Sequence, residues 1–170
     1  MTSPTAQEHR RQSPKSVEVG VMTVSDTRSL ETDEGGRLIE SMLVAAGHSV
    51  GARRIVRDER VLIAATAREL LEMTNVRALL VTGGTGLAAR DQTTEAIESL
   101  YDALIPGYGE LFRMLSFQEI GPSAMLSRAS AGRVNGKVVV TMPGSPAGVR
   151  LAMERLIVPE LAHFVFHAGG

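Results

Sequence analysis

The hydrophobic pattern divides the chain into short apolar segments that alternate with amphipathic ones. Strands are predicted at Val17–Ser25, His48–Val56, Val76–Val81 and Lys137–Met142. The third is a short, mainly apolar run that leads into glycines, which is typical of a strand buried on both faces of a sheet. The alternation of such strands with helical segments predicts an α/β fold.

Apolar residues at helical spacing predict a helix in the interval after each strand. Leu38, Met42, Ala45 and Ala46 fall on one helical face, and Gly47 is placed to end that helix. Further helices are predicted from Arg57, from Asp91 to about Ala103, from Gly107 to Arg128 with a break at Gly121-Pro122, and from Pro146. Pro159 is expected to kink or end the last of them.

Asn135-Gly136 interrupts two short apolar runs and predicts a hairpin, because both residues tolerate the positive φ of a type I′ turn. The hairpin adds an antiparallel pair, so a mixed, mostly parallel sheet is expected. A length of 170 residues without repeats or linkers favours one domain. We expect that domain at residues 16–168, behind a disordered N-terminal arm at residues 1–15 that is rich in Ser, Thr, Pro and Gln.

Composition narrows the function classes. The absence of cysteine excludes disulfides, thiolate metal sites and cysteine nucleophiles, and fits a cytoplasmic protein. No apolar run reaches the roughly 18 residues of a membrane span. Eighteen basic and nineteen acidic residues give a net charge of −1, which argues against a nucleic-acid partner. Glycine is enriched at 17 of 170 residues, against an average of about 7%.

Polar or glycine-rich turns follow the predicted strands, where ligands bind in open α/β sheets. The turns are Ser25-Asp26, Asp58, Thr82–Gly86 and Pro143–Pro146. Three glycines in Thr82–Gly86 expose backbone N–H groups before a helix, which suits an anion, although a tight turn without a ligand would have the same sequence. In the last turn, Ser145 is a good N-cap with Pro146 at the first helical position, and a second helix N-terminus there would suit a further anion.

The glycine turn matches neither of two familiar nucleotide motifs well. A Walker A loop needs a lysine after its second glycine, and both lysines, Lys15 and Lys137, lie elsewhere. Gly84-x-Gly86-x-x-Ala89 passes a loose dinucleotide pattern, but neither Tyr101 nor Tyr108 is followed four residues later by lysine. An NAD(P)-dependent short-chain-type oxidoreductase is therefore only a weak alternative.

Asp58 and Asp91 are the two carboxylates that stand out beside these turns. Each lies at the predicted start of a helix, where an Asp N-cap contributes about 1 kcal/mol. A carboxylate beside a bound phosphate repels it unless a cation lies between them, so a functional role implies Mg²⁺. Capping and metal binding both stay open for these two residues.

Separated motifs in a fixed order carry a resemblance to a known family. They are Thr82-Gly-Gly-Thr-Gly86 with Arg90-Asp91, Ser123-Ala-Met-Leu-Ser127-Arg128-Ala129 with Gly132, and Met142-Pro-Gly-Ser-Pro146. With Thr23-Val-Ser-Asp26 they resemble the MoaB/Mog family of molybdenum cofactor biosynthesis, and Phe117–Ala129 is more similar to the MoaB branch. The resemblance implies the molybdopterin-binding fold, a three-layer α/β/α sandwich that assembles as a homotrimer or homohexamer.

The resemblance also implies an activity, the Mg-ATP-dependent adenylylation of molybdopterin with release of pyrophosphate. It gives Asp58 and Asp91 the roles of essential, Mg²⁺-binding aspartates. The pterin-phosphate and nucleotide pocket would be lined by Ser25, Gly83, Gly84, Thr85, Gly86, Ser127, Gly144 and Ser145. A molybdenum-inserting partner protein is a further expectation, and a non-catalytic pterin-binding or assembly role is the main alternative. The family often has Asp-Val-Thr-Pro-Glu where this chain has Asp91-Gln-Thr-Thr-Glu95, a change that removes no polar group.

Overall fold

The computed structural model describes residues 13–169, so most of the predicted N-terminal arm lies outside the described residues. Six strands form one sheet in the order β2-β1-β3-β6-β5-β4. The strands are β1 (Glu18–Val24), β2 (Ser49–Val56), β3 (Ala78–Thr82), β4 (Ala103–Leu104), β5 (Ala131–Val134) and β6 (Lys137–Met142). Strands β2, β1, β3 and β6 are parallel, and β5 pairs antiparallel with both β6 and β4.

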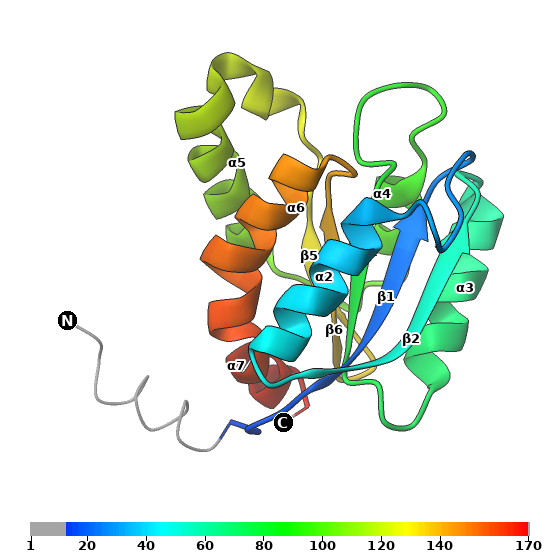
Figure 1. Ribbon diagram of the computed structural model, residues 1–170, viewed down its shortest axis with the longest axis vertical. Coiled ribbons are helices and arrows are strands. Elements are labelled where there is room, and N and C mark those ends of the chain that lie inside the picture. Colours follow the sequence, from blue (N-terminus) through cyan, green and yellow to red (C-terminus); the bar gives the residue numbers. More distant parts are fainter. Residues whose placement is uncertain (1–12, 170) are drawn as a thin grey trace.

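Helices cover both faces of this sheet (Figure 1). They are α2 (Glu34–Ala45), α3 (Arg60–Glu72), α4 (Thr93–Glu98), α5 (Pro106–Ile120), the 3₁₀ turn η1 (Gly121–Leu126), α6 (Pro146–Ala152), the π turn η2 (Met153–Ile157) and α7 (Val158–Ala168). One face packs against α2, α5, α6 and α7, and the other against α3 and α4. This confirms the predicted three-layer α/β/α arrangement around a mostly parallel mixed sheet.

Side chains of the central strand β3 explain the two layers. Successive residues of a strand point to opposite faces. Ala78 and Leu80 join the α2–α5–α6–α7 core, whereas Leu79 and Val81 join the α3–α4 core, and all four are fully buried. A strand that contributes to two cores is apolar throughout, as the sequence pattern predicted.

Several local signals have the predicted outcome. Gly47 follows α2 at φ +84°, and Asn135 and Gly136 form the hairpin turn at φ +49° and +76°. Gly121 separates α5 from η1 at φ +66°. At Pro159 the expected end of the helix is wrong, because α6, η2 and α7 follow one another without a break from Pro146 to Ala168. The irregularity is the π turn η2, which lies directly ahead of the proline.

The helix predicted from Asp91 to about Ala103 is wrong at both ends. Helix α4 spans only Thr93–Glu98. Ala103-Leu104 instead forms the edge strand β4, which pairs with Arg133 and Gly132 of β5. Pairing with a strand about 30 residues away determines the conformation of this segment, and helical spacing of apolar residues gives no information on such pairing.

None of the helices in the described part of the chain combines the length and apolar character that crossing a bilayer requires. The polar and glycine-rich turns that follow the four parallel strands lie together at one end of the sheet.

His48 predicts a pH-dependent stability. Its Nδ1 accepts a hydrogen bond from the Val17 N–H at 3.2 Å, and burial lowers the pKa of His48 below its ordinary value. The unfolded chain therefore binds the proton more readily, and stability should fall as pH drops below about 6.5. Urea unfolding at pH 7.5 and 5.5 should show this loss in the wild type and a smaller loss in His48→Gln; equal losses would contradict it.

Candidate functional site

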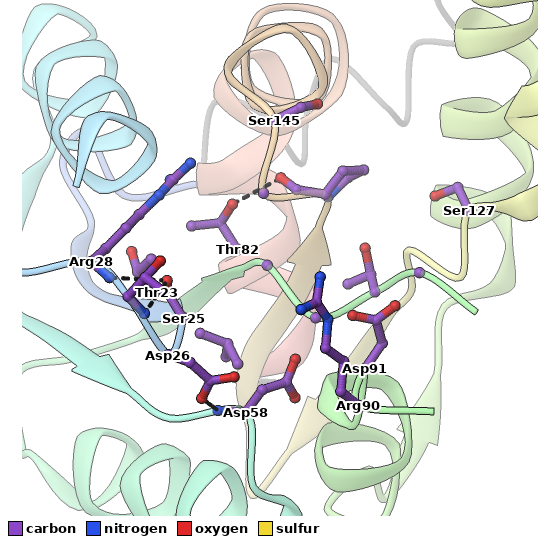
Figure 2. A pocket seen from close by; sticks show the side chains of 18 residues that line it. Thr23, Ser25, Asp26, Arg28, Asp58, Thr82, Arg90, Asp91, Ser127 and Ser145 are labelled. Atoms are coloured by element: carbon purple, nitrogen blue, oxygen red, sulfur yellow. Dashed lines mark hydrogen bonds between the residues drawn. The ribbon is translucent and has the colours of Figure 1, made fainter. Parts of the chain in front are cut away.

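The carboxyl ends of β1, β2, β3 and β6 meet at one edge of the sheet, where their turns surround a cavity of about 640 Å³ (Figure 2). All ten residues singled out in the sequence line it: Ser25, Asp58, Gly83, Gly84, Thr85, Gly86, Asp91, Ser127, Gly144 and Ser145. Because parallel strands place their carboxyl ends together, residues up to 120 positions apart become neighbours.

The glycine turn after β3 has a backbone that only glycine adopts without strain. Gly83 lies at φ +99° and Gly84 at φ +64°. A Cβ on Gly83 would approach the Val24 carbonyl oxygen closer than 3.0 Å, and one on Gly84 would collide with the Thr93 hydroxyl. The turn is anchored by the Gly83 N–H, which donates to the Met142 carbonyl at 3.1 Å. The glycines therefore allow this turn to line the cavity while packing closely against Val24 and Thr93.

Ser25 shapes the turn after β1. Its hydroxyl accepts hydrogen bonds from the N–H groups of Thr27 at 3.3 Å and Arg28 at 3.2 Å. Its own N–H donates to the Val56 carbonyl at 2.9 Å, which joins this turn to the end of β2. Ser25 thus holds the loop that carries Asp26 and Arg28 to the cavity.

Asp58 is not the N-cap of the helix that follows it. Glu59 has that position, without a side-chain hydrogen bond. Asp58 Oδ1 instead accepts the Gln92 N–H at 2.9 Å, and the Asp58 N–H donates to Asp26 Oδ1 at 3.1 Å. Through its carboxylate and its backbone N–H together, Asp58 therefore links the turns after β1, β2 and β3, a long-range role that a local capping rule cannot predict.

Burial raises the pKa of Asp58 above its ordinary value. The negative charges of Asp91 and Asp26 raise it further, while the Gln92 N–H and the Arg90 guanidinium lower it. The carboxylates of Asp26 and Asp91 thus lie near enough to Asp58 for their charges to disfavour its ionised form.

Asp91 does not cap a helix either, which excludes one of the two roles that the sequence left open for it. Gln92 is the N-cap of α4, and Asp91 Oδ2 accepts the Ala88 N–H at 2.9 Å within the preceding loop. A Cβ on Gly86 would lie 2.7 Å from the same oxygen, so the carboxylate stands directly against the glycine turn. Figure 2 shows the side chains of Asp58 and Asp91 on the same side of the cavity.

The prediction for Ser145 is confirmed. Its hydroxyl caps α6 by accepting the Gly148 N–H at 3.2 Å, with Pro146 at the first helical position. Gly144 lies beside the glycine turn, where an added Cβ would be 3.2 Å from the Gly83 Cα. The turn after β6 therefore packs directly against the turn after β3.

Two arginines line the cavity that the sequence reasoning did not assign to it. Arg28 Nη1 lies 4.0 Å from the buried carboxylate of Asp33, and Arg90 is exposed beside Asp91. Arg28 could have been identified from its position in the sequence, because it lies three residues after Ser25 in a turn that was already expected to form the site. These guanidinium groups give the cavity positive charge in addition to its carboxylates.

The donors present fit Mg²⁺ only if a ligand completes its coordination. Within residues 13–169 no group of three or more His, Cys, Asp or Glu side chains could hold a metal on its own. Mg²⁺ is usually bound through one or two carboxylates, with substrate phosphates and water supplying the rest. Asp58 and Asp91, beside a glycine turn that lines the same cavity, match that pattern.

Comparison with known proteins gives consistent matches over almost the whole described chain. Residues 20–163 match the family model described as a probable molybdopterin binding domain. Molybdenum cofactor biosynthesis protein B of Bacillus cereus is 48% identical over 160 residues, which cover 94% of this chain and 95% of the relative.

Solved structures show the same relationship. A crystal structure of a molybdenum cofactor biosynthesis protein B superposes with a TM-score of 0.89 at 47% identity, covering 92% of this chain and 98% of that one. The Mog protein of Mycobacterium ulcerans gives a TM-score of 0.81 at 25% identity, with 89% and 99% covered. The sequence is thus more similar to the first structure than to the Mog protein.

Proposed function

Since this chain belongs to the molybdopterin-binding family of molybdenum cofactor biosynthesis proteins, and its protein B homologues support a role in that biosynthesis, we propose that it is a molybdopterin adenylyltransferase. In the proposed reaction the terminal phosphate of molybdopterin attacks the α-phosphate of ATP. A new P–O–P bond forms, the bond from the α-phosphate to the β-phosphate's bridging oxygen breaks, and pyrophosphate leaves.

One observation carries this proposal: a positive-φ glycine turn lies against two carboxylates in a single cavity. The attacking group is an anionic phosphate, so no side chain has to be activated as a nucleophile. Phosphoryl-group transfer depends mostly on positioning and on stabilising negative charge. Backbone N–H groups of Gly84–Gly86 would orient phosphate oxygens, with Arg28 and Arg90 adding positive charge.

Asp58 and Asp91 would hold Mg²⁺ in this site. When bound, Mg²⁺ neutralises phosphate charge and fixes the relative orientation of the reacting groups. The chain's own contribution is to place the two carboxylates: Gln92 N–H fixes Asp58 and Ala88 N–H fixes Asp91.

Structure gives the weaker oxidoreductase alternative no support. Tyr101, Tyr108 and Lys137 are absent from the cavity lining. Tyr108 donates to the Thr141 carbonyl at 3.1 Å, and burial raises the pKa of both tyrosines. Lys137 donates to the Leu71 and Met73 carbonyls at the C-terminal end of α3. None of these groups is placed for proton transfer in the site.

The wild-type protein should form adenylyl-molybdopterin from molybdopterin and ATP only when Mg²⁺ is present. Mass spectrometry should detect the adenylate and pyrophosphate, and chelation with EDTA should stop both while added Mg²⁺ restores them. Tight molybdopterin binding without adenylate at any Mg²⁺ concentration would contradict the enzyme and favour a pterin-binding or assembly protein. Protection against heating by NADPH but not by ATP would favour the oxidoreductase.

The homotrimer or homohexamer and the molybdenum-inserting partner stay predictions drawn from the family resemblance. Size-exclusion chromatography with light scattering measures the first directly.

A further inference from the structure

Arg128 connects the two ends of the loop that joins the glycine turn to Asp91. Its Nε donates to the Gly86 carbonyl at 2.9 Å, and its Nη2 donates to the Asp91 carbonyl at 2.9 Å. Residues 87–90 between these carbonyls are exposed. One guanidinium therefore fixes the distance between the glycine turn and the aspartate across an otherwise exposed loop.

The arginine is itself held firmly. Its Nη1 forms an ion pair with Glu95 Oε1 on α4, and its N–H donates to the Thr85 carbonyl at 3.2 Å. Desolvation raises the pKa of Glu95, but hydrogen bonds from its own N–H and from Arg128 outweigh this and lower it overall. Glu95 is thus ionised at neutral pH and orients the guanidinium from behind.

Arg128 does not line the cavity, although its neighbour Ser127 does (Figure 2). Its charge is paired with Glu95, and two of its remaining donors are used on backbone carbonyls. A direct role as the counter-charge of a bound phosphate is therefore excluded by its contacts. Its contribution is geometric.

We propose that Arg128 is a positioning residue, which sets the separation between the N–H groups of the glycine turn and the Asp91 carboxylate that nucleotidyl transfer requires. The proposal rests on the proposed function for its catalytic consequence. Its structural basis is the planar guanidinium, whose donors reach Gly86, Asp91 and Glu95 at once, while the ammonium of lysine is a single point charge. Lysine at this position would keep the positive charge but lose the clamp, that is, the simultaneous hydrogen bonds to the Gly86 and Asp91 carbonyls.

The experiment compares Arg128→Lys and Arg128→Gln with the wild type. Both should lower kcat about 100-fold, because small misplacements of reacting groups have effects of that size, with KM for ATP changed far less. Amide hydrogen exchange, measured by mass spectrometry on the peptide covering residues 86–91, should be faster in both variants. Arg133→Gln is the matched control, since Arg133 pairs with Asp102 at 2.6 Å away from the cavity; it should change neither readout.

Each outcome decides between the two hypotheses. Full activity in Arg128→Lys would overturn the positioning role and leave charge as the relevant property, as would unchanged exchange in residues 86–91. A wild type that makes no adenylate would contradict the proposed function only, because hydrogen exchange still tests the clamp. If Arg128→Gln is poorly folded, Glu95→Gln provides the milder variant: it keeps both carbonyl contacts, loosens the guanidinium and should speed exchange to an intermediate degree.

Discussion

Asp91→Asn is expected to lower adenylate formation at least 100-fold while leaving the fold intact. Asparagine keeps an oxygen that can accept the Ala88 N–H, so the loop loses no hydrogen bond. It removes the negative charge beside the glycine turn, and with it one of the two carboxylates proposed to hold Mg²⁺. Loss of one group that stabilises transition-state charge commonly lowers kcat by 10²–10³.

Initial rates across a Mg²⁺ titration, together with thermal unfolding, check this expectation. The unfolding midpoint should match that of the wild type, and excess Mg²⁺ should recover only part of the rate. Asp102→Asn is the control, because Asp102 is an exposed carboxylate that pairs with Arg133 far from the cavity. Full activity in Asp91→Asn would mean that this side chain serves the loop alone.

The sequence predicted which turns meet because this depends on the order and direction of the strands and not on the conformation of each turn. Once β1, β2, β3 and β6 are parallel neighbours, the residues after each strand have to share one edge. Ser25, Gly83 and Ser145 therefore lie where the strand pattern placed them, although no single motif connects them.

Errors arose where a long-range contact decides a residue's role. Capping was one of the two roles left open for Asp58, but its carboxylate accepts the N–H of Gln92, 34 residues later. The sequence identified Arg128 only as part of a family motif. Its hydrogen-bond partners, the Gly86 and Asp91 carbonyls, lie 42 and 37 residues away along the chain. Helical spacing and capping rules describe neighbours within a few residues, so such partners are invisible to them.

Gly83→Ala should be the most destabilising single substitution considered, lowering the free energy of unfolding by roughly 3 kcal/mol or more. A side chain at φ +99° is strained by about 1–3 kcal/mol. Its Cβ would also press on the Val24 carbonyl oxygen, which belongs to the core strand β1 and cannot move independently, and overpacking of this kind adds about 1–3 kcal/mol. Thermal unfolding should show a midpoint about 10 °C lower, which follows from about 2–4 °C per kcal/mol at this chain length.

Gly47→Ala separates the two causes, since Gly47 lies at φ +84° with nothing within 4 Å of an added Cβ. It should bring only the backbone strain, about 1 kcal/mol. Equal losses in the two variants would show that the approach of the glycine turn to β1 contributes nothing beyond the φ requirement. A larger loss of stability in Gly83→Ala would show that the close contact between the glycine turn and β1 stabilises the fold. Weaker ATP binding by the protein that stays folded would show that the same contact places the turn where phosphate oxygens reach its N–H groups.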